Sequence, residues 1–132
     1  MLPRRLSALG AAPSYDIANL KKNRIRQILK SHSKGLYVFC RRKDGVPVYV
    51  GQSANLPQRL GLNHRSTNKN QAPVTKALKN KHSLGSMKKA REILYRDYVV
   101  RLISEPDTVM RAFLEIYAAW GWDTEFNSFE EH

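Results

Sequence analysis

Two short runs of β-forming residues, separated by a tight-turn signal, constrain the fold of this chain more than any other feature. Residues 36–40 and 46–50 are rich in aromatic and β-branched side chains, and Asp44-Gly45 lies between them. An Asp-Gly pair in this setting is a strong hairpin signal, because glycine accepts the positive φ that a tight turn requires. We therefore expect an antiparallel β-hairpin here.

The alternation of side chains along this hairpin brings two tyrosines to one face. Successive residues of a strand point to opposite sides, so Tyr37 and Phe39 face one way while Leu36 and Val38 face the other. Tyr49 on the second strand can stand on the same face as Tyr37. The two phenol hydroxyls can then meet at one site.

A short helix is expected directly after the hairpin. Ser53 or Asn55 is the candidate N-cap of a helix that begins near residues 56 and 57, where a proline suits the first turn. This places Arg59 on the helix and His64 at or just beyond its end.

The second half of the chain predicts one more strand and further helices. We expect a short helix over 73–79, a break at Gly85-Ser86, a third strand over 95–103, and a late helix from Ser104 to about residue 120. Ser104 is its expected N-cap and Gly121 its C-terminal cap. Glu115 lies on this helix among small residues, opposite a larger apolar set.

The N-terminal third is expected to be an irregular arm followed by a basic helix. Residues 1–15 lack helical periodicity, whereas 17–30 place their apolar side chains mostly on one face, with Ser14 or Asp16 as N-cap. This helix either tracks phosphates or merely covers the core. Together the elements predict an α+β fold with a small, mainly antiparallel three-stranded sheet flanked by helices. We assign residues 1–33 to the arm and basic helix and 34–132 to the main domain.

The charge of the chain predicts its class of partner. Residues 1–101 carry 22 Lys and Arg against 4 Asp and Glu, whereas residues 102–132 carry 1 against 7, and the formal net charge is +12. Such a surface favours a nucleic acid, because each neutralised phosphate releases counterions. Lysines that merely solvate the protein, or that bind an anionic membrane, are the alternatives that charge alone leaves open. No stretch approaches the ~20 apolar residues of a membrane span. The lone Cys40 excludes an intrachain disulfide and is expected to be buried. We expect a cytoplasmic or nucleoid-associated protein, with an organelle presequence as the alternative.

Residues 34–65, which read KGLYVFCRRKDGVPVYVGQSANLPQRLGLNHR, resemble the GIY-YIG nuclease superfamily. Gly35-Leu36-Tyr37 matches the first half of the family motif and Tyr49-Val50-Gly51 the second, with Leu and Val in place of Ile. Arg59 follows ten residues after Tyr49. Glu115 and Asn127 match the family's metal-binding glutamate and structural asparagine, so the resemblance covers 35–127.

The resemblance implies a metal-dependent DNA endonuclease, restriction-like or standalone, that uses Mg²⁺ or Mn²⁺. Tyr37 would be the general base, Tyr49 would position groups beside it, and Arg59 would bind the phosphate. Glu115 would hold the metal, and Gly35, Gly51 and Asn127 would support the site. His64 is the rival base, because an imidazole pKa near ~6.5 suits proton transfer.

Further basic residues between the catalytic helix and the third strand are expected to contact the DNA backbone. They are Arg65, Lys69, Lys76, Lys79, Lys81, Lys88 and Lys89. A homodimer would allow both strands to be cut with one site per chain. The main alternative is a non-catalytic nucleic-acid-binding module with the same fold, and an RNA-directed protein ranks last.

Overall fold

The centre of the molecule is one antiparallel sheet with the strand order β1-β4-β2-β3, so that β1 and β3 are the edge strands. The structure is a computed structural model that describes residues 2–127. Its strands are β1 (Ser14–Asp16), β2 (Gly35–Arg41), β3 (Pro47–Ser53) and β4 (Tyr98–Ser104). The predicted α+β class and antiparallel pairing are confirmed. The expected number of three strands is wrong, because β1 adds a fourth.

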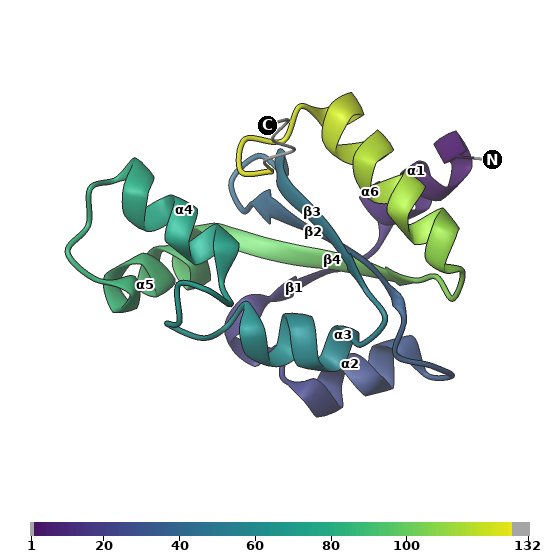
Figure 1. Ribbon diagram of the computed structural model, residues 1–132, viewed down its shortest axis with the longest axis horizontal. Coiled ribbons are helices and arrows are strands. Elements are labelled where there is room, and N and C mark those ends of the chain that lie inside the picture. The colour runs from purple at the N-terminus through teal and green to yellow at the C-terminus, as the bar shows by residue number, and fades with distance from the viewer. Residues whose placement is uncertain (1, 128–132) are drawn as a thin grey trace.

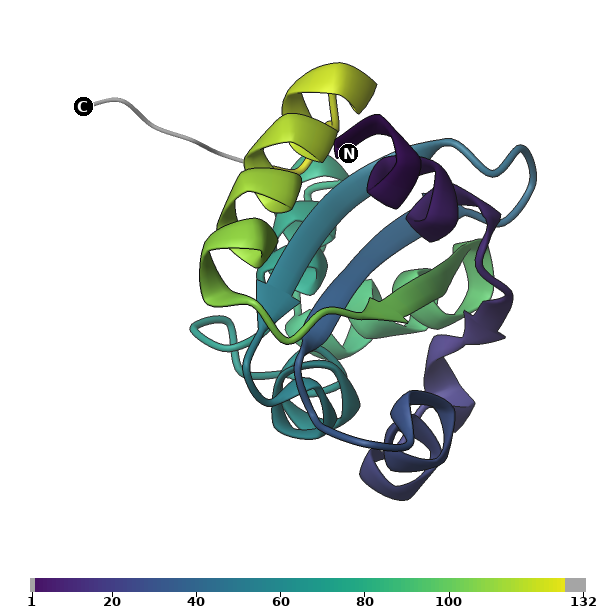
Figure 2. The same cartoon turned by 90° about the vertical axis from the view of Figure 1, so that its right-hand side faces the viewer.

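Helices cover both faces of this sheet (Figures 1 and 2). They are α1 (Leu2–Ala11), η1 (Ile17–Asn19), α2 (Lys22–Leu29), α3 (Leu56–Gln58), η2 (Arg59–Asn63), α4 (Pro73–Lys81), α5 (Met87–Asp97) and α6 (Thr108–Trp122). α1 and α6 bury one apolar cluster against the sheet, and the remaining helices bury the other. No helix within residues 2–127 has the length and apolarity to cross a membrane.

The hairpin forms as its sequence predicts. Gly45 has a φ of 73° in the turn, and the Asp44 carboxylate accepts a hydrogen bond of 3.1 Å from the amide of Val46. Tyr37 and Phe39 belong to the cluster beneath α2 to α5, whereas Leu36, Val38 and Cys40 belong to the cluster beneath α1 and α6. The expected alternation, and the burial of Cys40, are therefore confirmed.

The helix after the hairpin also begins where the sequence predicts. The side chain of Asn55, one of the two candidate caps, accepts a hydrogen bond of 3.2 Å from the amide of Gln58. The helix then widens into the π-helical turn η2, in which the amide of His64 donates to the carbonyl of Arg59 five residues earlier. His64 is the C-cap residue of this turn, as expected.

The N-terminal expectations are wrong in three respects. Residues 2–11 form a helix rather than an irregular arm, because Leu9 is buried against the sheet and α6. Residues 14–16 pair with β4, so Ser14 is a strand residue and not a helix cap. The basic helix expected over 17–30 is divided into η1 and α2 by Leu20, whose ψ of 65° is not helical, and Asp16 makes no capping hydrogen bond through its side chain.

Two boundaries in the second half also differ from expectation. The strand expected over 95–103 begins at Tyr98, because residues 95–97 complete the last turn of α5. The late helix begins at Thr108 and not at Ser104, since it is Asp107 that accepts the capping hydrogen bond, 2.8 Å, from the amide of Met110. It ends with Asp123 in the left-handed conformation rather than at Gly121.

Candidate active site

Two glycines allow close packing around the hairpin tyrosines. Tyr37 lies opposite Gly51 in the strand register, and a Cβ atom at Gly51 would overlap the ring and the hydroxyl oxygen of Tyr37. A Cβ atom at Gly35 would overlap the backbone oxygen of Ile103 on β4. Both positions therefore require glycine on steric grounds. Gly51 sets where the Tyr37 hydroxyl lies, and Gly35 lets β2 and β4 approach.

The hydroxyl of Tyr37 forms a hydrogen bond with His64. The distance from the hydroxyl oxygen to Nε2 is 2.7 Å, and the exposed fractions of the two residues are 1% and 0%. The imidazole ring packs against Phe39 and Tyr49, with ring centres 5.0 and 5.7 Å away. Its other nitrogen, Nδ1, has no hydrogen-bond partner among residues 2–127. Buried polar atoms are rarely left unpaired, so this nitrogen is an exception within the described residues.

Burial keeps the phenol and the imidazole of this pair neutral. Burial raises the pKa of Tyr37 far above its usual value, Tyr49 raises it further, and Arg59 lowers it. Burial, followed by the charge of Arg59, lowers the pKa of His64 to about 3. At neutral pH the pair therefore shares a single hydrogen-bonding proton between phenol and imidazole.

Tyr49 stands on the same face, nearer to solvent. Its ring centre lies 6.4 Å from that of Tyr37, and its side chain is half-buried where that of Tyr37 is fully buried. Burial raises the pKa of Tyr49, and Glu115 raises it further, whereas Arg59 lowers it. The predicted meeting of both tyrosines on one face is therefore confirmed.

Arg59 supplies the positive charge of the cluster. It projects from η2, and its Nη1 donates a hydrogen bond of 3.0 Å to the carbonyl of Gln71. A guanidinium has five N–H donors, so this bond leaves donors for an anion. The charge of Arg59 also lowers the pKa of Tyr37, Tyr49 and Glu115. Arg59 thus lowers the pKa of each of the other four residues in the predicted catalytic set.

Glu115 comes from α6, which packs along the edge strand β3. Burial raises the pKa of its carboxyl, and Arg59 lowers it. The Glu115 charge in turn raises the pKa of both Tyr37 and Tyr49, so the carboxylate belongs to the same electrostatic cluster although α6 covers the opposite face of the sheet.

A buried arginine that the sequence analysis did not assign holds α6 in this position. Arg111 donates from Nε to the Gln52 side chain at 3.0 Å and from Nη1 to the backbone carbonyls of Glu105 and Pro106. Arg111 is only 3% exposed. It lies one helical turn before Glu115, so it fixes the start of α6 against β3. An arginine within an apolar helical stretch was the only sequence signal for this role.

The donor set at Glu115 suits a cation that keeps most of its water. Within residues 2–127 no group of three His, Cys, Asp or Glu side chains gathers at one point. A zinc site would need three or four such ligands, whereas Mg²⁺ binds through one or two carboxylates, substrate phosphates and water. A single carboxylate such as that of Glu115 is compatible with Mg²⁺ or Mn²⁺ in that mode.

Asn127 attaches the C-terminal segment to β3. Its Oδ1 accepts from the Val50 amide at 2.8 Å and its Nδ2 donates to the Val50 carbonyl at 2.9 Å. The Thr124 hydroxyl also donates to Oδ1. Val50 lies between Tyr49 and Gly51, so the side chain of Asn127 satisfies backbone groups on the free edge of β3, the strand that carries Tyr49. This geometry gives Asn127 a structural part.

The residues expected to contact DNA divide into two kinds. Arg65 is half-buried, and its guanidinium donates to the carbonyls of Ile17, Gly61 and Ala18, so it holds η1 and η2 together. The lysines are half-buried or exposed and lie around α4 and α5; they are Lys69, Lys76, Lys79, Lys81, Lys88 and Lys89. The geometry therefore gives Arg65 a structural role. The lysine charges lie at the surface, where that of Lys81 forms an ion pair with Glu125.

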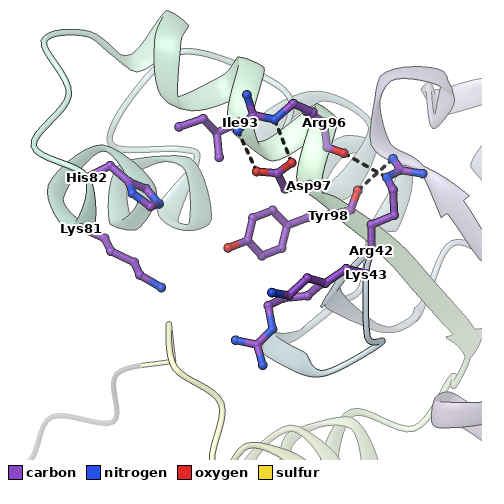
Figure 3. Close-up of a pocket in the computed structure, with 9 residues that line it drawn as sticks. Arg42, Lys43, Lys81, His82, Ile93, Arg96, Asp97 and Tyr98 are labelled. Atoms are coloured by element: carbon purple, nitrogen blue, oxygen red, sulfur yellow. Dashed lines mark hydrogen bonds and ion pairs between the residues drawn. The ribbon is translucent and has the colours of Figure 1, made fainter.

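A cavity of about 390 Å³ lies between α5 and the turn end of the hairpin, and Tyr37 is not among the residues that line it (Figure 3). Much of the positive charge around this cavity is paired with carboxylates and carbonyls of the chain. Arg42 donates to the carboxylate of Asp16 and to the carbonyls of residues 95, 96 and 98, and Arg96 forms an ion pair with Asp97. Its lining is Arg41, Arg42, Lys43, Lys81, His82, Ile93, Arg96, Asp97 and Tyr98. Hydrogen bonds from Arg42 beside the cavity therefore hold α5 against the hairpin.

Comparisons of the chain with protein-family models, with curated proteins and with solved structures gave no match.

Proposed function

We propose that this chain is a divalent-metal-dependent endonuclease of the GIY-YIG type that hydrolyses phosphodiester bonds in DNA. The observation that carries the proposal is the hydrogen bond between Tyr37 and His64 beside Arg59 and Glu115, one cation and one carboxylate that both act on the Tyr37 phenol. Hydrolysis needs a proton acceptor for the attacking water, positive charge at the phosphoryl oxygens and support for the leaving oxygen. The cluster contains a group for each need.

Tyr37 and His64 act together as the base in this proposal. His64 is fully buried, so it takes its proton from Tyr37 and not from water. The Tyr37 hydroxyl gives its proton to Nε2, and the phenolate accepts a proton from the water that attacks phosphorus. The regenerated Tyr37 hydroxyl then passes a proton to the leaving oxygen, and Nε2 returns its proton to the phenolate, so that both residues are restored. The low pKa of His64 opposes the first of these transfers. The positive charge of Arg59 favours the phenolate, because it lowers the pKa of Tyr37. Tyr49, the more exposed phenol, orients the water.

Arg59, and a cation held by Glu115, would neutralise the negative charge of the substrate phosphate. The planar guanidinium of Arg59 can donate two parallel hydrogen bonds to the phosphoryl oxygens. Glu115 would hold the Mg²⁺ or Mn²⁺, and the cation when bound would neutralise the phosphoryl oxygens and assist departure of the leaving oxygen. Arg111 keeps Glu115 in place through its bonds to Gln52 and the start of α6.

The surface lysines support DNA as the substrate. The six lysines around α4 and α5 follow the helix that carries Arg59, and residues 1–101 carry a large excess of positive charge. Contacts of this kind bind the phosphate backbone without reading sequence. They would hold a duplex near the tyrosine face while the reaction occurs.

One observation favours a second candidate function, a non-catalytic nucleic-acid-binding module. Tyr37 and His64 are shielded from solvent, which is also what two core residues without a catalytic role would show. Such a module binds DNA with strong salt dependence and cuts nothing.

A panel of substrates separates the two candidates. Single-stranded, double-stranded and branched DNA would be incubated with the purified chain in Mg²⁺ or Mn²⁺, and binding would be measured on the same substrates. Cleavage of at least one substrate that EDTA abolishes supports the nuclease. Salt-sensitive binding without cleavage of any substrate in either metal supports the binding module.

A further inference from the structure

The outer face of α6 carries large apolar side chains that nothing within residues 2–127 covers. Trp120 is 82% exposed and Val109 63%, and Phe113, Ile116 and Tyr117 are each more than 40% exposed. A single exposed apolar residue needs no explanation, but a contiguous set on one helix marks an interaction surface. We call these five residues the α6 seam.

The spacing of the seam is that of a helix-pairing interface. Val109, Phe113, Ile116 and Trp120 are separated by four, three and four residues, which is the a/d repeat that places side chains along one line of a helix. Tyr117 and the exposed Ala112 flank this line, and no charged residue interrupts it. Helices with such a line bury it against another helix.

We propose that the α6 seam binds the same seam of a second copy of this chain, with the two helices antiparallel about a two-fold axis. The seam is self-complementary in that arrangement. Phe113 of one copy lies opposite Ile116 of the other, and Val109 lies opposite Trp120. Both pairs are centred on the same point of α6, between residues 114 and 115, so a single two-fold axis relates them. A two-fold interface requires this property, since both copies present the same surface.

The exposed apolar area is sufficient for a dimer. Taking roughly 150 to 250 Å² for each large side chain, the exposed fractions of the seam correspond to roughly 600 Å² per copy. Two copies would then bury about 1,200 Å², which is at the lower end of specific protein interfaces.

The distribution of charge favours a second copy over a nucleic acid at this surface. Phosphates are bound by lysine and arginine, and the seam offers neither. Two copies of a basic chain repel each other, and residues 102–132, which include α6, form the part with more acidic than basic residues. Approach through α6 therefore brings together the least positive parts of the two chains.

The dimer leaves the candidate active site free. Residues two positions apart on a helix differ in direction by about 200°, so Glu115 points away from the line through Phe113 and Ile116. Buried Arg111 and Ala118 lie on the same inner side as Glu115. The proposal does not rest on the proposed function, because a binding module with this α6 would pair in the same way.

Sedimentation velocity over a range of concentrations tests the proposal. We expect a species of about 30 kDa, twice the 15.2 kDa of one chain, which dissociates on dilution. Phe113→Glu and Trp120→Glu should each weaken the dimer at least tenfold with unchanged circular dichroism, because both side chains are exposed. Val46→Glu, which changes an exposed apolar residue on the hairpin, is the matched control and should leave the dimer intact. A monomer at all concentrations, or a dimer that both seam variants retain, would overturn the proposal.

Cysteine cross-linking tests the antiparallel arrangement separately. In a Cys40→Ala background, a mixture of Phe113→Cys and Ile116→Cys chains should form a disulfide-linked pair under mild oxidation, because only opposed positions bring the Cβ atoms within about 4.5 Å. A mixture of Val109→Cys and Phe113→Cys chains is the matched control and should cross-link at least tenfold more slowly. Equal rates in the two mixtures would contradict the arrangement.

Discussion

The Tyr37 hydroxyl and the Nε2 atom of His64 lie 2.7 Å apart although 27 residues separate them in the sequence. The fold thus joins the two residues that the sequence offers as rival bases. A change to either one alters the hydrogen-bond partner of the other. Their roles have to be tested as those of a pair, with Tyr49 as the reference phenol on the same face.

Removal of the Tyr37 hydroxyl should reduce cleavage far more than removal of the Tyr49 hydroxyl. In the proposed mechanism Tyr37→Phe eliminates the proton acceptor, so we expect a loss of at least about 100-fold in the single-turnover rate, in the range of general-base catalysis. Tyr49→Phe only loses orientation of the water, with an expected loss of about tenfold or less. Single-turnover rates on one labelled substrate check this. The reverse order would transfer the role of base to Tyr49.

The buried imidazole should make the stability of the fold depend on pH. The pKa of His64 is about 3 in the folded state, against about 6.5 in an unfolded chain. The unfolded state therefore binds more protons between these values, and stability falls as the pH decreases below about 6.5. From pH 7 to pH 5 this residue should cost about 2 kcal/mol of unfolding free energy.

His64→Gln is the variant that isolates this effect, because glutamine keeps an acceptor for the Tyr37 hydroxyl and does not titrate in this range. Urea unfolding of both proteins at several pH values from 5 to 7 gives the comparison. Between pH 7 and pH 5 the free energy of unfolding should fall by about 2 kcal/mol more in the wild type than in the variant. Equal losses in the two proteins would mean that His64 titrates normally in the folded state.

A methyl group at Gly51 should displace the Tyr37 ring from its position in the site. Gly51→Ala overlaps the Tyr37 ring, so we expect about 1–3 kcal/mol of destabilisation together with loss of cleavage. Gly121→Ala is the matched control, because nothing lies within 4 Å of its added Cβ atom and alanine is the better helix former. That variant should gain stability by up to about 1 kcal/mol. Thermal and urea unfolding measure both. A neutral Gly51→Ala would contradict the steric role of this glycine.

Two of the predicted DNA-contacting residues should behave in opposite ways. Lys76 is exposed on α4, so Lys76→Ala should weaken DNA binding a few-fold and reduce the salt slope by about 0.9 without changing stability. Arg65→Ala breaks the bonds to Ile17, Ala18 and Gly61 and should cost about 2 kcal/mol or more of stability. Fluorescence anisotropy at several salt concentrations and urea unfolding separate the two effects. A stable Arg65→Ala with weakened binding would make Arg65 a phosphate contact after all.

Local patterns predicted the parts of the fold that local forces determine. Strand alternation brought Tyr37 and Tyr49 to one face, and the Asp44-Gly45 turn and the Asn55 cap are short-range signals that tertiary packing did not override. These elements carry most of the candidate site. Its hairpin and the start of its arginine helix could therefore be anticipated in detail.

The remaining features depend on contacts between distant segments. α1 forms because Leu9 finds a place against the sheet, and β1 is only three residues of edge pairing, too short for a pattern. Asp107 replaces Ser104 as the cap of α6 because the chain leaves β4 through an extended segment. The bond between Tyr37 and His64, and the brace that Arg111 forms, require three-dimensional proximity that no spacing in the sequence reveals.

The rate of DNA cleavage by the wild type and by Glu115→Ala, measured side by side in Mg²⁺ or Mn²⁺, tests the central claim most directly. Supercoiled plasmid would report a single nick. We predict relaxation by the wild type, a loss of at least about 100-fold in Glu115→Ala because the cation loses its protein ligand, and nearly unchanged DNA binding. Cleavage by Glu115→Ala at the wild-type rate would contradict the account.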